Sequence, residues 1–159
     1  MFQNLNNKLA DAPSEKGQLA LVIGPTEVAD VMTSKVITLS PHHSLNDAVN
    51  LMNDRCFRHC VVVDGAGKIA GVISDRDILR ALARHANSQT KSLDQIMSRT
   101  PYTVKPNTPI CDAVAKMLAK RINCLPVVTD DGTVCGIVTS TDLLKSYQQL
   151  LDLLQKQAG

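Results

Sequence analysis

GVISDRDIL, at residues 71–79, is followed 65 positions later by GIVTSTDLL, at residues 136–144. Both stretches keep a glycine, two apolar residues, a serine or threonine and, three residues further on, an aspartate. When the whole chain is shifted by 65, residues 32–80 align with residues 97–145 without a gap, and 13 of the 49 pairs are identical. Self-similarity at a fixed period means that one structural unit is repeated. The chain therefore contains two copies of the same unit.

Each copy opens with a short β-rich piece that a proline ends, because proline cannot donate to a strand ladder. An amphipathic helix is predicted next, over residues 44–55 and 109–121, where apolar residues recur at positions i, i+3, i+4 and i+7. Ser44 is a suitable N-cap for the first of these helices. Pro109 takes the same place in the second, where its missing N–H does no harm.

Two short apolar runs around a glycine-containing turn follow in each copy and predict a β-hairpin with both faces covered. A last helix is expected to begin at Asp75 and at Ser140, with acidic residues in its first turn. Each unit is therefore β-α-β-β-α, and a unit of about 50 residues is too small to bury its own sheet on both sides. We expect an α/β (α+β) sandwich in which two units pack sheet to sheet around one shared core and an approximate twofold axis. The expected divisions are an N-terminal extension at residues 1–24, the first repeat at 25–84, a linker at 85–91, the second repeat at 92–147 and a C-terminal helical extension at 148–159.

The composition is that of a globular protein, with 44% hydrophobic and 20% charged residues. Aromatic residues make up 3% and tryptophan is absent, so the stacking surface that single-strand binders use is not expected. The formal net charge is +2 and the cations form no runs, which argues against a nucleic-acid partner. Neither a signal peptide nor an apolar run long enough to span a bilayer can be identified, so no membrane partner is expected.

The five cysteines are an odd number and include no C-x-x-C pair. We expect reduced thiols that serve as small core residues, and a cytoplasmic location. The four histidines have no metal-ligand spacing, and neither paired carboxylates nor a nucleophile with its base can be identified. No metal site and no catalytic cofactor are expected, and the protein is predicted not to be an enzyme.

The repeated motif places a hydroxyl at the end of a strand and an aspartate one helical turn later. Free N–H groups and the dipole at the start of a helix favour phosphate, to which Ser74 and Thr139 can donate. Asp77 and Asp142 would repel phosphate, so the hydroxyls of a sugar suit them better. Ribose together with phosphate indicates a nucleotide. The alternative is structural, because the hydroxyl and the aspartate can also cap the helix as a capping box.

These residues resemble the CBS domain, named for cystathionine β-synthase, whose units occur in tandem as a pair called a Bateman module. The resemblance covers residues 27–147 and rests on DVMTSKVITLSP, on NCLPVV before an Asp/Gly turn, and on the closing motif of both copies. It implies an α/β sandwich of two pseudosymmetric repeats with adenosine ligands bound between them. AMP, ADP or ATP are the implied regulatory ligands, and S-adenosylmethionine or NAD is less expected. In the family the aspartate binds the ribose and the serine or threonine binds the phosphate.

Three further residues are assigned to the phosphate side of the first repeat. Arg58 and His59 match family positions that face the ligand, and Arg76 adds a cation inside the first motif. Their counterparts in the second repeat are Asn123, Cys124 and Thr141. We therefore expect phosphates to point toward the first repeat, whose cleft would suit a di- or triphosphate. The alternative is that the two arginines are solvated and that the histidine is an ordinary, partly buried residue.

An apolar slot for adenine would come from the first and third strands of the repeats. The candidates are Ile37, Thr38, Tyr102, Thr103, Ile73 and Val138. Ordinary core residues at these positions are the alternative. The sequence departs from the family at one place, since the proline usual before the second strand is present as Pro126 but is replaced by Val61.

The last helix is predicted to run past the family unit with an apolar stripe along it. The stripe consists of Leu143, Tyr147, Leu150, Leu151 and Leu154. It either packs back on its own module or forms a dimer contact. We expect a homodimeric regulatory module that signals nucleotide binding to a protein partner of unknown identity, and a ligand-independent interaction module is the alternative. Residues 19–23 are expected to dock as an extra strand or lid.

Overall fold

The computed structural model describes residues 24–84 and 90–158. The first repeat contains α1 (Val28–Val31), β1 (Thr38–Leu39), α2 (Leu45–Arg55), β2 (His59–Val63), β3 (Ile69–Ser74) and α3 (Asp75–Arg84). The second part contains the 3-10 turn η2 (Leu93–Gln95), α4 (Ile110–Lys120), β4 (Cys124–Val128), β5 (Val134–Thr139) and α5 (Ser140–Ala158). The strand or lid expected at residues 19–23 and most of the linker lie outside the described residues.

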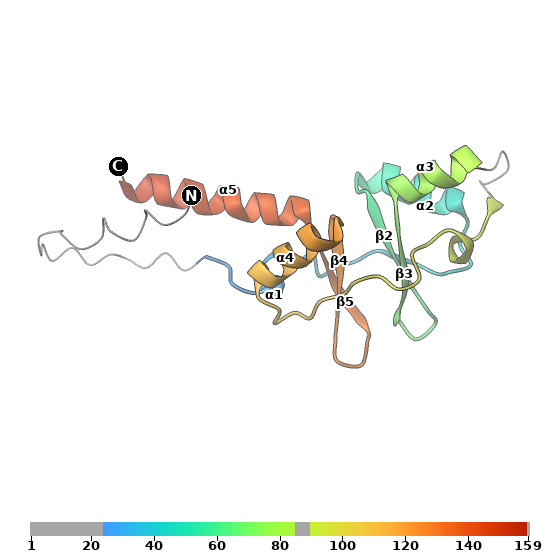
Figure 1. Cartoon of the computed structure of the whole chain (residues 1–159), viewed down its shortest axis with the longest axis horizontal. Coiled ribbons are helices and arrows are strands. Elements are labelled where there is room, and N and C mark those ends of the chain that lie inside the picture. The colour runs from blue at the N-terminus through green and yellow to red at the C-terminus, as the bar shows by residue number, and fades with distance from the viewer. Residues whose placement is uncertain (1–23, 85–89, 159) are drawn as a thin grey trace, which may run out of the picture.

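Each repeat builds a small sheet around one hairpin, and the two hairpins stand side by side with helices above them (Figure 1). In the first repeat β1 pairs parallel with β2, and β2 pairs antiparallel with β3. In the second repeat β4 pairs antiparallel with β5. The register is the same in both hairpins, because His59 lies opposite Ser74 and Cys124 lies opposite Thr139. The expected α+β sandwich of two pseudosymmetric units is confirmed.

The first strand that we expected in the second repeat is wrong, because this segment forms only one bridge, between Val104 and Val127. In the first repeat the matching strand β1 also pairs Thr38 with Val61. The position of Val61 is Pro126 in the second repeat. Proline has no N–H to donate, so the matching second pair of this parallel ladder does not form.

The helices begin where local sequence signals place them. The Ser44 hydroxyl accepts the Asp47 N–H at 3.2 Å, and the Asp47 carboxylate accepts the Ser44 N–H at 2.7 Å, which makes a reciprocal capping box for α2. Pro109 is the N-cap of α4, and α3 and α5 begin at Asp75 and Ser140. These four starts are confirmed.

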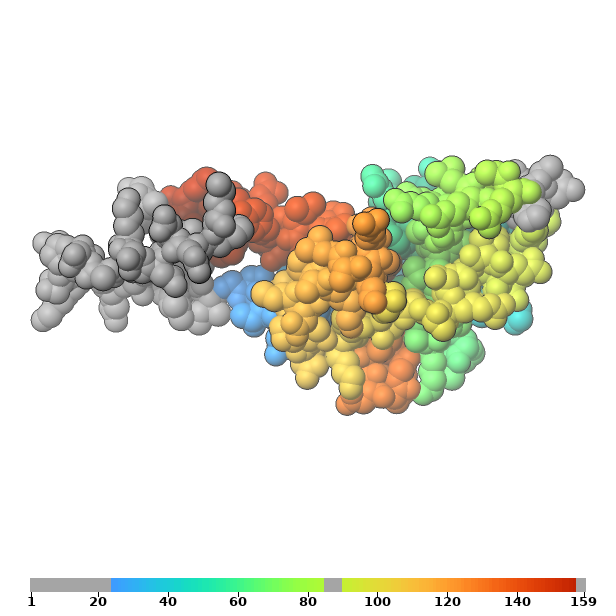
Figure 2. Space-filling view, viewed as in Figure 1, coloured from blue at the N-terminus to red at the C-terminus, as the bar shows by residue number. Residues whose placement is uncertain are grey.

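Each repeat lends its opening segment to the other repeat. Thr33, just after α1, forms an antiparallel bridge with Ile137 of β5, with N···O distances of 2.9 and 3.0 Å. Ser98, just after η2, forms the matching bridge with Val72 of β3, at 2.9 and 3.1 Å. Figure 2 shows the segment that follows residue 90, in yellow, lying against the first repeat. The two repeats therefore exchange their first residues.

This exchange explains the glycine that opens each motif. A Cβ atom on Gly71 would lie 2.6 Å from the Met97 sulfur and 2.8 Å from the carbonyl oxygen of Ser98. A Cβ atom on Gly136 would lie 2.5 Å from the Met32 sulfur. Carbon atoms in close-packed interiors do not approach other atoms this closely, so a side chain at either glycine would force the opening segment of the other repeat, or its methionine, to shift.

Most of the buried residues form two clusters, one in each repeat, where we expected a single shared core. The first consists of Leu39, Leu45, Ala48, Met52, Cys60, Val62, Ile73, Ile78, Ala81 and Leu93. The second consists of Val28, Val104, Ala113, Met117, Leu125, Val127 and Val138. The helices close a separate core against one face of each sheet, which is why two clusters result. Leu93 and Val28, from the exchanged segments, each complete the core of the other repeat.

The opposite faces of the sheets are covered as well. Cys60 and Val62 face the helices, so the side chain of Val61 between them points the other way, where it is fully buried. The turns of the two hairpins are also hydrogen-bonded, with the Val134 N–H donating to the Gly67 carbonyl at 3.1 Å. The repeats therefore meet through their sheets.

Two of the five cysteines are buried, two are exposed and Cys135 is partly buried. Cys60 and Cys124 are core residues as expected. Burial raises the pKa of both thiols to about 12, so they stay protonated. The expectation is wrong for Cys56 and Cys111, which are exposed. Cys56 instead ends α2 with a left-handed backbone at φ 54°.

The helix α5 runs out beyond the body of the molecule (Figures 1 and 2). It has 19 residues, nearly twice as many as α3, which ends the first repeat. Among the described residues, no helix is both long enough and apolar enough to cross a bilayer.

Candidate functional site

The hydroxyl and the aspartate of each motif bond to one another at the start of a helix. Ser74 Oγ donates to Asp77 Oδ2 at 2.6 Å, and the Ser74 N–H donates to the same oxygen at 2.9 Å. Thr139 and Asp142 repeat these contacts at 2.6 and 2.8 Å. Each aspartate N–H donates back to the hydroxyl at 3.3 Å. Both pairs therefore form the capping box that was the structural alternative, and it uses one carboxylate oxygen of each aspartate.

The second carboxylate oxygen differs between the two motifs. Asp77 Oδ1 lies 3.4 Å from Nη1 of Arg80, one turn further along α3. The matching residue in α5 is Lys145, and within residues 24–84 and 90–158 it makes no ion pair with Asp142. The Asp77–Arg80 pair is weak, because the Arg80 side chain is 60% exposed. One oxygen of Asp142 is thus open to a ligand, whereas a ligand at Asp77 must displace Arg80.

Two bridging segments, residues 33–38 and 98–104, connect the motifs. The first starts beside Ile137, inside the second motif, and ends in the sheet of the first repeat. The second starts beside Val72, inside the first motif, and ends beside Val127 in the second repeat. Both segments therefore run between the repeats, where a ligand held by a motif would touch them.

The proposed adenine residues of these segments offer exposed surface. Ile37 is 40% exposed and Tyr102 is 48% exposed, and Thr38 and Thr103 are partly buried. The Tyr102 ring lies 5.0 Å from Nζ of Lys120, so one of its faces packs against a cation of α4. The structure therefore places this tyrosine beside α4 as well as between the repeats.

Ile73 and Val138 behave differently from the other four adenine candidates. Both are fully buried, and each belongs to the core cluster of its own repeat. Neither side chain offers surface to a ligand in this structure. At these two positions the alternative, an ordinary core residue, therefore describes the structure.

The three proposed phosphate ligands of the first repeat come from neighbouring backbone, because the Asp75 N–H donates to the Arg58 carbonyl at 3.0 Å and His59 lies opposite Ser74. Arg58 and Arg76 are exposed, and neither side chain bonds to another described residue. His59 lies opposite Ser74 and is partly buried. Burial lowers the pKa of His59, against the attraction of Asp75 and Asp77 for its proton. At neutral pH the ring is therefore uncharged and can offer a hydrogen bond but not a positive charge.

The charge of Asp77 also reaches the second repeat. Cys124 stands where His59 stands in the first repeat, and the Asp77 carboxylate adds to the burial that raises the pKa of this thiol. Asp77 thus lies near the junction of the repeats. Within the described residues, no three side chains of His, Cys, Asp or Glu gather as metal ligands would.

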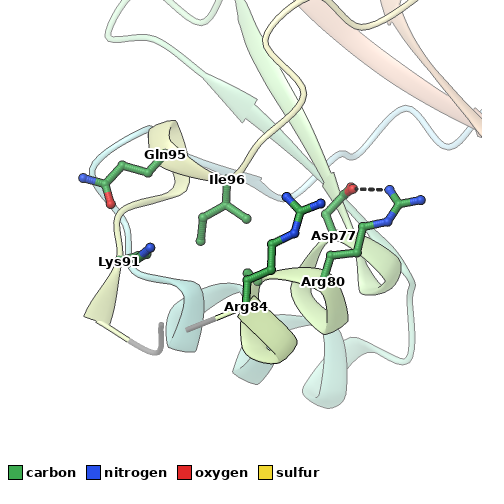
Figure 3. Close-up of a pocket in the computed structure, with 7 residues that line it drawn as sticks. Asp77, Arg80, Arg84, Lys91, Gln95 and Ile96 are labelled. Atoms are coloured by element: carbon green, nitrogen blue, oxygen red, sulfur yellow. Dashed lines mark hydrogen bonds and ion pairs between the residues drawn. The ribbon is translucent and has the colours of Figure 1, made fainter. Parts of the chain in front are cut away.

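A cavity of about 450 Å³ opens beside Asp77. Its lining consists of Asp77, Arg80, Ala81, Arg84, Lys91, Gln95 and Ile96. Figure 3 shows Arg80 and Arg84 on α3 at one side and Lys91 and Gln95 at the other. Sequence reasoning missed Arg84 and Lys91, because both lie beyond the repeated motif. The signal was a difference between the copies, since Arg84 of the first copy becomes Gln149 of the second.

A family model described as the CBS domain matches residues 28–84 and matches again over residues 93–149. The two matches contain both motifs and cover most of the chain. The chain belongs to the CBS-domain family. As a CBS-domain pair it carries a family unit in each repeat, and α5 continues nine residues beyond the second match to Ala158.

Solved CBS-domain structures share this fold. A Vibrio cholerae protein described as an acetoin utilization protein (AcuB) is 32% identical with a TM-score of 0.74, and the match covers 82% of this chain and 96% of that one. The CBS domain pair of protein MJ0100, in complex with 5′-methylthioadenosine and S-adenosyl-L-methionine, is 32% identical with a TM-score of 0.72, covering 78% and 97%. CBSX2 in complex with AMP is 26% identical with a TM-score of 0.72, covering 79% and 98%.

Curated relatives include larger enzymes. A homoserine O-acetyltransferase of Methanococcoides burtonii is 35% identical over 133 residues, and an L-aspartate semialdehyde sulfurtransferase of Methanocaldococcus jannaschii is 32% identical over 122 residues. The matches cover 81% and 77% of this chain but only 26% and 23% of those enzymes. The chain thus spans about a quarter of the length of these relatives.

Proposed function

We propose that this chain is a non-enzymatic cytoplasmic sensor module that binds an adenine nucleotide, AMP, ADP or ATP, between its two repeats. The observation that carries the proposal is the pair of hydroxyl–aspartate motifs, both at helix starts and both next to a bridging segment. The AMP in CBSX2 and the adenosine compounds in MJ0100 support an adenosine ligand. S-Adenosylmethionine and NAD are the less favoured ligands.

Each motif supplies complementary groups for a nucleotide. The free oxygen of Asp142 accepts a ribose hydroxyl, while its other oxygen stays bonded to Thr139. The N–H groups at the start of α5 favour a phosphate, and Thr139 can donate to it after releasing Asp142. Ser74 and Asp77 provide the same set at α3, where Arg80 competes with the ribose. Ile37, Thr38, Tyr102 and Thr103 provide the surface for the base.

Binding becomes a signal through the bridging segments. A ligand moves a conformational equilibrium only by its different affinities for the two states. A nucleotide that contacts residues 33–38 or 98–104 also contacts both repeats, so it favours one relative orientation of them. A partner protein that recognises this orientation then responds to the nucleotide.

The test is titration calorimetry of the full chain with AMP, ADP, ATP and S-adenosylmethionine. We expect Asp142→Ala to weaken nucleotide binding at least about tenfold, since a hydrogen bond to a charged group contributes roughly 1.5–3 kcal/mol. Asp152→Ala is the matched control, because Asp152 is an exposed acid of the same helix and lies away from the motif. Absence of binding at millimolar ligand by the folded protein rejects the sensor function, and an unchanged affinity in Asp142→Ala rejects the ribose role.

Self-association is the second candidate function, and the exposed face of α5 favours it. The α5 seam, defined as Leu144, Tyr147, Leu151 and Leu154, has the 3-4-3 spacing of a coiled-coil contact. Its four side chains are 39–68% exposed. The flanking residues Gln148 and Gln155 carry no charge, so a second copy of the same helix meets no like-charge repulsion. We infer that two copies of the chain pair through this seam.

Sedimentation velocity over a range of concentrations tests the pairing. Leu151→Glu places a charge in the seam and should shift the protein to monomer. Gln149→Glu adds the same charge to α5 outside the seam and should leave the dimer intact. A wild-type chain that stays monomeric, both whole and without residues 1–23, contradicts the proposal. If only the shortened chain dimerises, residues of the same chain cover the seam instead.

A further inference from the structure

The cavity beside Asp77 is lined by cations from two separate parts of the chain. Asp77, Arg80 and Arg84 lie three and four residues apart on α3, so they share one face of the helix. Lys91 and Gln95 face them from the segment that opens the second repeat (Figure 3). Asp77 and Arg84 are two turns apart, which places them roughly 10 Å from one another along the helix axis. The cavity therefore extends from the motif toward the end of α3.

The charges of this cavity are not balanced within the described residues. Asp77 pairs with Arg80, at 3.4 Å, and is the only acid in the lining. Arg84 and Lys91 form no ion pair with any acid of residues 24–84 and 90–158. Three cations thus face one carboxylate. Such a cluster is stabilised by an anion, because like charges brought close together repel one another.

The second repeat shows that these cations are not needed for the fold. Shifted by 65, Arg80 becomes Lys145, Arg84 becomes Gln149, Lys91 becomes Thr26 and Gln95 becomes Asp30. At these positions one cation accompanies two carboxylates, Asp142 and Asp30. Asp30 accepts the N–H groups of Thr26 and Glu27 at 2.9 and 3.0 Å and closes a cap. The matching region of the second repeat therefore folds without Arg84 and Lys91, so the fold does not require their charge, which is available for binding.

We propose that this cavity binds phosphate groups through Arg80, Arg84 and Lys91, and that the phosphates belong to a nucleotide held at Asp77. The assignment of the phosphates to a nucleotide rests on the function proposed above, whereas phosphate binding by the cavity does not. Ribose binding at Asp77 frees Arg80, which adds a third cation to the phosphate site at the moment when the nucleotide arrives. The first repeat then selects a polyphosphate, and the second repeat does not distinguish AMP from ATP.

Calorimetry in an Asp142→Ala background isolates the first repeat. The test variant is Arg84→Gln with Lys91→Thr, which gives this cavity the residues of the second repeat and should fold with an unchanged melting temperature. We expect ATP to bind about tenfold more weakly to this variant, and AMP to change by less than about threefold. Arg55→Gln, which removes an exposed cation at the end of α2, is the matched control and should change neither. Equal ATP affinity in the test variant overturns the proposal.

Titration with inorganic tripolyphosphate separates phosphate binding by the cavity from nucleotide binding at Asp77. If the phosphates belong to a nucleotide at Asp77, Asp77→Asn weakens ATP binding as much as the cavity variant does. Tripolyphosphate that binds through Arg84 and Lys91, with no binding of ATP or AMP to any variant, supports the phosphate cavity and rejects the nucleotide sensor. Nucleotides that bind with no dependence on Arg84 and Lys91 support the sensor and reject the cavity. If neither ligand binds, both are rejected.

Discussion

The residues of the two repeats differ least at positions that contact the other repeat, and most around the aspartate of the motif. Gly71 and Gly136 each pack against a methionine of the opposite repeat, and the residue is identical in the two copies. Arg84 and Gln149 occupy one position of the repeat and carry different charges, because no contact between the repeats depends on them. Contact between the repeats thus fixes the frame, whereas the residues around the two motifs carry different charges.

The largest expected effect is a loss of stability that differs between the two motif glycines. Gly71→Ala should destabilise the protein by roughly 3 kcal/mol, because its Cβ meets the Ser98 carbonyl oxygen at 2.8 Å and that oxygen also accepts the Val72 N–H. Gly136→Ala should cost only about 1 kcal/mol, since its close neighbour is the flexible end of the Met32 side chain. Urea unfolding of both variants measures the difference. Equal losses of stability in the two variants would contradict the prediction that a clash with a backbone oxygen costs more than a clash with a flexible side chain.

A smaller effect sharpens the contrast between His59 and its counterpart Cys124. Burial lowers the pKa of His59 below 6.5, so the unfolded chain takes up this proton more readily than the folded chain. Stability is therefore lost as the pH falls through about 6.5, the ordinary pKa of the ring. His59→Cys, which copies the second repeat, should remove this loss. Denaturation at pH 7.5 and pH 5.5 tests it, and an identical pH dependence in the variant would refute the assignment.

The smallest effect concerns the two hairpin turns. Hydrogen bonds from Thr129 and Thr133 lower the pKa of Asp131 to about 2, whereas the matching residue of the first repeat is Ala66. The interactions of this carboxylate are complete above its ordinary pKa of 3.8 and are lost as the pH falls toward 2. Thr129→Val should raise the pKa of Asp131 toward 3.8, measured by NMR titration of the side chain. A pKa that stays near 2 would assign the shift to other groups.

Local patterns were enough to predict the elements that carry the site. The helix starts at Asp75 and Ser140 follow from residues within one turn of each start, and the i, i+3 spacing of Ser74 and Asp77 already allowed the bond now seen between them. The missing strand of the second repeat could also have been foreseen, because Pro126 cannot donate where Val61 can.

The exchange of opening segments could not be predicted, and the reason is the repeat itself. Because the chain repeats with a period of 65, the sequence pattern allows a methionine to pack on the glycine of its own repeat or on that of the other repeat. Met32 could therefore pack on Gly71 or on Gly136. The pattern is unchanged by the exchange, so only the three-dimensional structure distinguishes the two arrangements. The cavity includes an exchanged segment as well, because Lys91 and Gln95 belong to the part of the chain that opens the second repeat and line the cavity together with α3 of the first.

The exchanged segments also bear on the origin of the pair. A protein with a single copy would have a core that lacks its closing leucine or valine, and an opening segment with no glycine of its own to pack on. Two such proteins would complete one another, as subunits that swap an identical arm. The pseudo-twofold axis within this chain would be the twofold axis of such a homodimer. Joined in one polypeptide, the two repeats need not stay identical, and each motif can have its own neighbouring residues, as Arg84 and Gln149 show.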